Sequence, residues 1–120
     1  MSLNILAERI HNGNKNRGFW DEKRNVGEML MLVVTELSEA LEAHRSGKMF
    51  NKANKINYEG AEDMTQAFKD NIKDTFEDEI ADAMIRLLDM CGGLGIDIEF
   101  HVLSKVLYNS TRPYKHGKKY

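Results

Sequence analysis

Hydrophobic residues recur along this chain at the three- and four-residue spacings that place side chains on one face of an α-helix. Four runs of this kind predict helices over about residues 3–12, 21–45, 74–91 and 97–108. No run alternates β-branched and polar residues as a strand does, and the single proline, Pro113, lies beyond all four runs. The pattern therefore predicts an all-α fold, a four-helix bundle formed by one domain that spans residues 1–120.

Local signals mark the ends of these predicted helices. The segment His11-Asn12-Gly13-Asn14 is expected to end the first helix, and Gly92-Gly93 is expected to end the third. Asp97 stands where a cap of the fourth helix is expected. Residues 47–72 form a long connection between the second and third helices, in which residues 47–60 are expected to form a loop and residues 62–71 have a weak helical pattern. This connection is the part of the chain whose structure the pattern predicts least.

Two pairs of carboxylates lie against the apolar faces of the predicted helices. Glu36 and Glu39 are three residues apart in the second helix, and Glu79 and Asp82 repeat the spacing in the third. Residues at this spacing project side by side from one helix face. Glu36 falls within an apolar arc, where an uncompensated carboxylate is costly to desolvate or stays protonated. Facing each other, the two pairs predict a cage of four hard oxygen donors that suits Mg²⁺, or Mn²⁺ in its place.

The same spacing also has a simpler interpretation. Pairs of glutamates three residues apart are common on helices, where most of them face solvent or pair within the helix. The pattern alone leaves both interpretations open. It disfavours other chemistry, because no glycine-rich phosphate loop is present and none of the four histidines lies three residues after a glutamate of the cage. A single cysteine, Cys91, also disfavours zinc.

Composition and charge narrow the classes of protein. The chain has 120 residues, of which 42% are hydrophobic and 30% charged, and its formal net charge is −2. This balance predicts one globular domain and gives no reason to expect a nucleic-acid or membrane partner. Cys91 lies on an apolar stripe and is expected to be a buried small residue. No apolar run is long enough to span a bilayer, and no signal-peptide core is evident, so a cytoplasmic location is expected.

Two further features have both a structural and a functional interpretation. Trp20, the only tryptophan, either caps the core or offers a flat face for stacking a nucleobase. Residues 109–120 form a basic tail, which by itself is typical of a disordered chain end. Beside an acidic metal cage, the same tail offers Arg and Lys side chains that would neutralise phosphate oxygens.

Taken in order, Glu36-x-x-Glu39, Glu79-x-x-Asp82 and the tail resemble the MazG-like all-α nucleoside triphosphate pyrophosphohydrolases. The segment Phe76 to Ala83 looks like the second metal-binding helix of that family, and Arg112-Pro113-Tyr114-x-His116-Gly117-Lys118 looks like the end of its bacterial and phage-type members. The resemblance covers most of the chain. It implies Mg²⁺-dependent hydrolysis of a nucleoside triphosphate, with ribose or deoxyribose, to the monophosphate and pyrophosphate.

The resemblance also implies roles for individual residues. Glu36, Glu39, Glu79 and Asp82 would hold the metal, and Glu39 or Glu36 would also act as general base. His11 and Trp20 stand where some members place residues that contact the base. The expected phosphate-binding residues are basic or polar side chains: Lys73, Lys105, Asn109, Arg112 and Lys115.

One departure from the family concerns residues 47–72, which are longer than the corresponding connection in its compact members. This segment would shape the substrate pocket, form a flap or contact another subunit. Wide apolar arcs on the second and third helices, together with the resemblance, predict a homodimer or homotetramer. Two alternatives stay open: a non-enzymatic helical interaction protein, and a pyrophosphatase that acts on a dinucleotide or a nucleotide-sugar.

Overall fold

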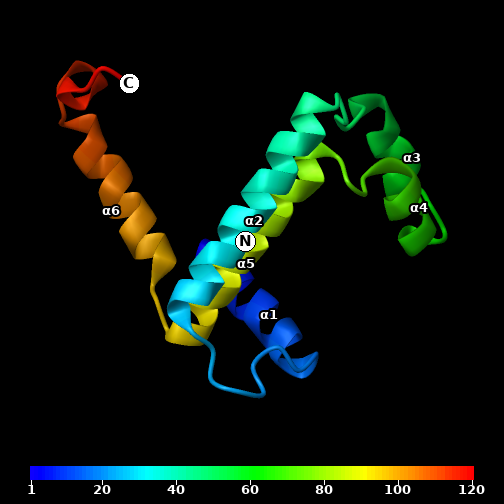
Figure 1. Cartoon of the computed structure of the whole chain (residues 1–120), viewed down its shortest axis with the longest axis horizontal. Helices are drawn as coiled ribbons and strands as arrows, with labels where there is room; N and C mark the ends of the chain where they lie inside the picture. The colour runs from blue at the N-terminus through cyan, green and yellow to red at the C-terminus, as the bar shows by residue number, and fades with distance from the viewer. The chain divides into compact units, whose positions relative to one another are not determined.

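The computed structural model describes residues 1–120 and contains helices and connecting turns but no strand. The six α-helices are α1 (Leu3–Asn16), α2 (Val26–Arg45), α3 (Lys55–Glu59), α4 (Met64–Asn71), α5 (Phe76–Leu94) and α6 (Ile98–Ser110) (Figure 1). Two short 3-10 helices, η1 and η2, cover Lys52–Asn54 and Tyr114–Gly117. The all-α prediction is confirmed, although six α-helices replace the four that were predicted. No helix combines the length and the apolar character needed to cross a membrane.

The chain divides into two compact units. The first unit contains residues 1–21 and 88–120, and the second contains residues 22–87. Helix α5 contributes its residues up to Leu87 to the second unit and its residues from Leu88 onward to the first. The prediction of one domain over residues 1–120 stays a prediction.

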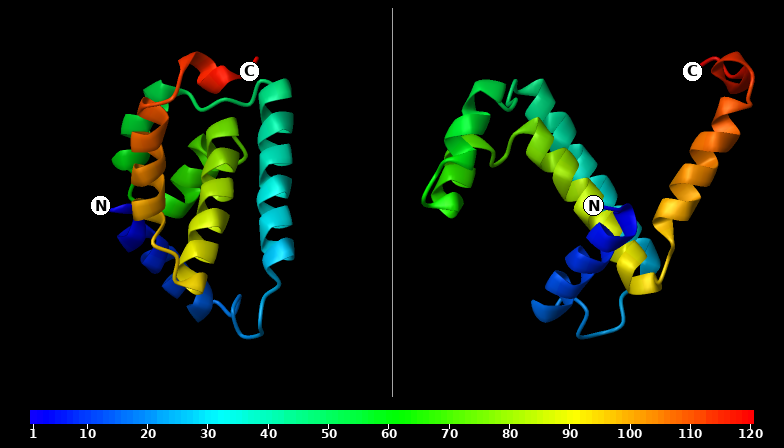
Figure 2. Two further views of the ribbon diagram at one scale, coloured as in Figure 1. Left: turned by 90° about the vertical axis from the view of Figure 1, so that its left-hand side faces the viewer. Right: turned by 180° about the vertical axis from the view of Figure 1, so that it is seen from behind.

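In the second unit, α2 and the first part of α5 run antiparallel and side by side (Figures 1 and 2). Asn25 caps α2, because its Oδ1 accepts a hydrogen bond from the Glu28 backbone N–H at 2.9 Å. Helix α2 therefore begins at Val26 and not, as predicted, at Asp21. The buried apolar side chains of the second unit are mostly small: Met29, Val33, Ala40, Ala43, Ala67 and Ala83. Small side chains let the two helix backbones approach closely.

The long connection of residues 47–72 is ordered as η1, α3 and α4. Helices α3 and α4 lie side by side, and Asp63 caps α4 by accepting a hydrogen bond from Gln66 N–H at 3.1 Å. The start of the connection is joined to the start of α5, since Phe76 N–H donates to Lys48 O at 2.7 Å and Phe50 N–H donates to Glu77 Oε2 at 2.8 Å. The expectation of a loop before residue 60 is therefore wrong for η1 and α3, and the weak helical pattern of residues 62–71 corresponds to α4.

In the first unit, α1 is four residues longer than predicted and ends at Asn16. Asn14 explains the extension, because its Nδ2 donates to Asp89 Oδ2 at 3.0 Å, and this tertiary bond favours helix beyond the predicted break. At the other end of α1, Asn4 Nδ2 donates to Asp97 Oδ1 at 2.7 Å. Asp97 also caps α6, as predicted, by accepting from Phe100 N–H at 3.1 Å.

Helix α5 continues through Gly92-Gly93 to Leu94, so the predicted stop at these glycines is wrong. The glycines permit close packing inside the helix. A Cβ at Gly92 would lie 2.8 Å from the Ala7 carbonyl oxygen, and a Cβ at Gly93 would overlap the Trp20 ring. The helix ends instead before Gly95, whose φ of +67° is readily adopted only by glycine. Cys91 is buried as predicted.

Candidate metal centre

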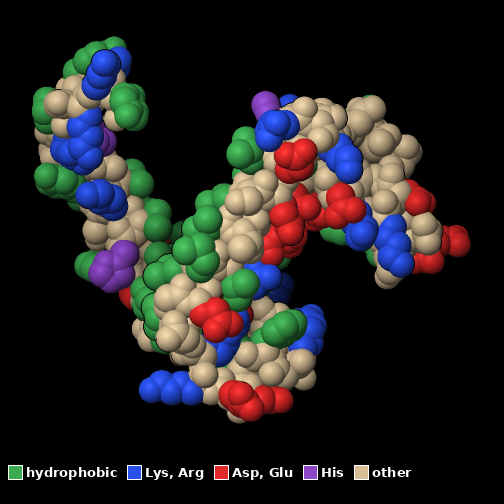
Figure 3. All heavy atoms as spheres, viewed as in Figure 1, with side chains coloured by type: hydrophobic (Ala, Val, Ile, Leu, Met, Phe, Trp, Pro, Cys, Tyr) green, Lys and Arg blue, Asp and Glu red, His purple; other side chains and the backbone are tan.

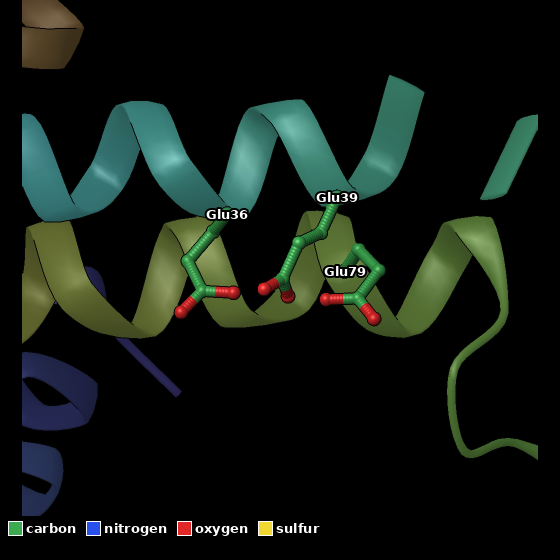
Figure 4. A group of neighbouring side chains, drawn as sticks. All are labelled: Glu36, Glu39 and Glu79. Atoms are coloured by element: carbon green, nitrogen blue, oxygen red, sulfur yellow. The ribbon is translucent and has the colours of Figure 1, made fainter. Parts of the chain in front are cut away.

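Three carboxylates from two helices converge in the second unit. Glu36 and Glu39 project from α2, and Glu79 projects from α5 toward them (Figure 4). One oxygen from each of the three side chains can be chosen so that all three oxygens lie within 4.8 Å of one another. The antiparallel packing of α2 and α5 produces this convergence, because it sets the two i, i+3 faces against each other. Three of the four residues predicted to form the cage are thus brought together.

Burial differs among the three carboxylates. Glu79 is 7% exposed and Glu36 is 9% exposed, whereas Glu39 is exposed to solvent. Glu36 follows Met29 and Val33 along the buried face of α2, as its place in the apolar arc predicted. The group therefore has two carboxylates at its base and one at an edge that water and a solute reach.

Arg86 provides a counter-charge that the sequence analysis missed. Its Nε lies 2.7 Å from Glu36 Oε1, which gives the buried Glu36 a charged hydrogen-bond partner within the protein. Arg86 follows Glu79 by seven residues, so both side chains project from nearly the same face of α5. That spacing was a signal for Arg86 in the sequence. The ion pair means that Glu36 by itself does not require a metal.

Glu79 has no such partner. Its Oε2 is buried and makes no hydrogen bond. Burial, a hydrogen bond with Glu39 and the charge of Glu39, followed by the charges of Asp82 and Asp78, raise the pKa of Glu79 from 4.5 to about 7. A carboxylate in this environment is stabilised either by a proton or by a cation. An oxygen without a partner beside two further carboxylates fits a hard divalent cation such as Mg²⁺.

Asp82, the fourth predicted ligand, is not part of this group of three. It lies half-buried one turn beyond Glu79 on α5. Burial raises the pKa of Asp82, as do the charges of Asp78, Glu36 and Glu39, while Arg86 lowers it. Asp82 therefore interacts electrostatically with the group, and its role as a metal ligand stays a prediction.

His11 and Trp20, the predicted base-contacting residues, belong to the first unit and meet at a buried carboxylate. Trp20 Nε1 donates to Asp89 Oδ1 at 3.0 Å, and His11 Nδ1 lies 3.1 Å from the same oxygen. The two rings pack edge to face with centroids 4.7 Å apart. Asp89 is 4% exposed and also accepts from Asn14. This arrangement supports the structural interpretation of Trp20, and contact with a base stays a prediction.

Sequence analysis missed Asp89 because the residue carries no motif and lies ten residues after Glu79 on the same helix. Its place on the apolar face of the predicted helix was only a weak indication that Asp89 is buried and needs a polar partner. The contact with His11, 78 positions away, was not visible in any local pattern.

Four of the five predicted phosphate-binding residues lie in or after α6, in the first unit. Lys105 Nζ and Arg112 Cζ lie 5.2 and 5.5 Å from the centroid of the Tyr108 ring, and Arg112 Nη1 donates to Asn109 Oδ1 at 3.4 Å. Lys115 lies beyond α6, in η2. Arg112 and Lys115 also line a cavity of about 490 Å³. The other residues around the cavity are Pro113, His116, Lys118, Lys119 and Tyr120. The tail thus forms a turn with a cationic hollow.

The fifth residue, Lys73, lies in the second unit just before α5. Its Nζ donates to Asp74 Oδ2 at 3.3 Å, and both side chains are well exposed. An exposed pair of this kind contributes little to stability, so the lysine remains accessible to an anion.

Comparison with protein-family models, with curated proteins and with solved structures finds no match. The resemblance to the MazG-like family therefore stays a prediction.

The raised pKa of Glu79 predicts a pH-dependent stability in the absence of divalent ions. A carboxyl group whose pKa rises from 4.5 to about 7 on folding stabilises the fold fully below pH 4.5 and loses that contribution as the pH rises through about 7. The change is at most roughly 3–4 kcal/mol, because one pKa unit corresponds to about 1.4 kcal/mol. Urea unfolding in EDTA is therefore expected to give a lower free energy of unfolding at pH 8 than at pH 5.5.

The matched control for this prediction is Glu79→Gln, which is expected to reduce the difference between the two pH values. A wild-type protein equally stable at both values, or a difference that Glu79→Gln leaves unchanged, would show that Glu79 does not titrate in this range.

Proposed function

We propose that this protein is a Mg²⁺-dependent hydrolase that converts a nucleoside or deoxynucleoside triphosphate to the monophosphate and pyrophosphate. The observation that carries the proposal is the convergence of Glu36, Glu39 and the buried Glu79, whose Oε2 makes no hydrogen bond. Hard, anionic oxygen donors on two rigid helices are suited to a hard divalent cation. The choice of triphosphate hydrolysis, among the reactions that such cations assist, rests on the resemblance of the motifs and tail to the MazG-like family.

Glu36, Glu39 and Glu79 would hold the cation, with Asp82 as a further ligand. When bound, the divalent cation supplies Lewis-acid activation of water and neutralises charge on the triphosphate. Glu39 is the better candidate for general base, because it is exposed at the edge of the group whereas Glu36 already accepts a hydrogen bond from Arg86. Glu39 would accept the proton of the attacking water at a carboxylate oxygen.

Basic side chains would offset the charge that develops on the departing pyrophosphate. Lys73 stands nearest in sequence to the start of α5 and is only weakly paired. The other four candidates belong to the first unit: Lys105, Asn109, Arg112 and Lys115. Of these, Arg112 and Lys115 line the cationic hollow of the tail, where their charged groups could contact phosphate oxygens. His11 and Trp20 would contact the base only through the ring surfaces that their packing leaves accessible.

Exposed apolar faces support the proposal of a homodimer or homotetramer. Leu30, Val34, Leu37 and Leu41 follow one another at four- and three-residue intervals on α2 and are 46–60% exposed. Helix α6 exposes a second apolar face, formed by Phe100, Leu103, Val106 and Leu107. Figure 3 shows hydrophobic side chains gathered over α2 and over α6. The same faces also favour the alternative function, a helical interaction protein, in which a different partner covers them.

The proposal is tested with a panel of canonical and modified ribo- and deoxyribonucleoside triphosphates, incubated with Mg²⁺ or Mn²⁺ and analysed by chromatography for monophosphate and pyrophosphate. Release of pyrophosphate from at least one nucleotide, abolished in Glu39→Gln, is the expected result. No product from any nucleotide with either metal would contradict the proposal. Turnover of only a dinucleotide or nucleotide-sugar in the same assay would instead establish the alternative substrate class.

A further inference from the structure

A cavity of about 370 Å³ lies along α4, in the segment that connects α2 to α5. This α4 cavity is lined by five residues: Met64, Thr65, Phe68, Lys69 and Lys73. The four that belong to α4 share one face of the helix, while the buried Ala67 lies on the opposite side. The volume falls in the range of roughly 300–1,000 Å³ that is typical of small-molecule sites.

The lining combines an apolar wall with positive charge. Phe68, which is half-buried, contributes an aromatic ring, and Met64 contributes a flexible side chain that is 46% exposed. Lys69 and Lys73 add two ammonium groups, and no acidic residue lines the cavity. A complementary ligand therefore has a flat apolar part and carries negative charge.

Lys73 links the α4 cavity to the carboxylates of the candidate metal centre, within the same unit of the chain. Its backbone N–H donates to Phe68 O at 2.9 Å, which holds it against the end of α4. Its Nζ donates to Asp74 Oδ2 at 3.3 Å, and oxygens of Asp74 and Glu79 lie within 4.8 Å of each other. Figure 3 shows basic side chains over α3 and α4 close to acidic side chains over the neighbouring half of α5. A short series of contacts thus leads from the cavity to Glu79.

The polar atoms of the two residues expected to contact the base are engaged elsewhere. Trp20 Nε1 and His11 Nδ1 both lie within 3.1 Å of the buried Asp89 carboxylate, and the two rings pack against each other. These residues belong to the first unit, whereas the α4 cavity places the Phe68 ring in the same unit as the carboxylates. The α4 cavity is therefore the better candidate for binding a base.

We propose that the α4 cavity holds the nucleobase of the substrate, with Phe68 against the face of the base and Lys73 beside the phosphate nearest the nucleoside. This inference rests on the proposed function, from which the choice of a nucleotide as the ligand comes. A nucleotide combines a flat ring with negative charge, and a base stacks on an aromatic side chain through its π-face. Residues 47–72 would then shape the substrate pocket, one of the three roles expected of this segment.

The test is saturation-transfer difference NMR with a panel of ribo- and deoxyribonucleoside monophosphates in EDTA, so that no divalent cation takes part. At least one monophosphate is expected to bind the wild type, with its base protons receiving the most saturation. Phe68→Leu is expected to weaken this binding roughly ten-fold, because leucine is apolar but offers no ring for stacking. Met64→Ala is a second, more exposed variant and is expected to weaken the binding in the same direction.

Ile56→Ala is the matched control for Met64→Ala. Ile56 is an aliphatic residue of the neighbouring helix α3, is 78% exposed and does not line the cavity, so binding is expected to be unchanged. A second ligand, inorganic tripolyphosphate with Mg²⁺, has no base and is measured by isothermal titration calorimetry. Phe68→Leu is expected to leave tripolyphosphate binding unchanged. A parallel loss of both ligands would show a structural role for Phe68 and overturn its assignment to the base.

Other outcomes separate this inference from the proposed function. Monophosphate binding that neither Phe68→Leu nor Met64→Ala weakens would overturn the α4 cavity as the base site, as would a wild type that binds no monophosphate. Pyrophosphate release from a triphosphate would in either case leave the proposed function standing. Monophosphate binding that both variants weaken, without pyrophosphate release from any triphosphate, would support the α4 cavity and contradict the proposed function.

Discussion

Glu79→Gln is expected to lower pyrophosphate release by roughly 100- to 1000-fold, which corresponds to about 3–4 kcal/mol of activation free energy. Glutamine preserves the size of the side chain but removes the charge at the position between Glu39 and the start of α5. The proposed cation would then lose its most buried ligand. Steady-state kinetics at saturating Mg²⁺ measure the effect.

The same variant is expected to be at least as stable as the wild type without divalent ions. Burial and acidic neighbours disfavour the ionised form of Glu79 in the folded protein, and an uncharged amide removes this unfavourable contribution. A loss of activity together with unchanged or increased stability distinguishes a functional carboxylate from a structural one. Glu77→Gln is the control and should retain activity. Full Mg²⁺-dependent turnover by Glu79→Gln would show that the assignment of the metal centre is wrong.

Asp89→Ala is expected to destabilise the fold by about 3–5 kcal/mol, because removing one partner of a buried charged network leaves the others unsatisfied. Trp20, His11 and Asn14 each place a nitrogen within 3.1 Å of the Asp89 carboxylate, which is 4% exposed. Thermal and urea unfolding measure the loss. The fluorescence of Trp20, the only tryptophan, is expected to change in the folded variant as its indole N–H loses this acceptor.

Asp63→Ala is a suitable comparison for Asp89→Ala. Asp63 is an exposed aspartate that caps α4 through one hydrogen bond, so its removal is expected to cost only about 1 kcal/mol. A similar loss for both variants would mean that the network around Asp89 contributes no more than a helix cap.

Local patterns in the sequence were sufficient to predict the all-α fold and the residues that meet in the carboxylate group. Helical periodicity places Glu36 against the core and Glu39 beside it, and the same reasoning puts Glu79 on the facing helix. These inferences need only the i, i+3 geometry of a helix. The structure confirms the convergence of the three side chains, whereas the metal they are proposed to hold stays a prediction.

Tertiary contacts explain what local patterns did not predict. The pair Gly92-Gly93 predicts a helix end, yet both glycines lie inside α5 because α1 and Trp20 pack against them. Asn14 is a weak helix former whose bond to Asp89 extends α1. The seven-residue spacing from Glu79 indicates the face of α5 on which Arg86 lies, but not its pairing with Glu36, 50 positions away. In each case a contact between distant segments outweighs the local preference.

The central claim is that Glu36, Glu39 and Glu79 form a divalent-cation centre, and its most direct test is the melting temperature measured with and without Mg²⁺ at pH 7.5. Binding to the folded state raises the melting temperature, by an amount that grows with the free ion concentration. The account predicts a rise for the wild type and for Glu77→Gln, and no rise for Glu79→Gln. A wild-type melting temperature that Mg²⁺ and Mn²⁺ leave unchanged would contradict the metal centre and favour a helical interaction protein.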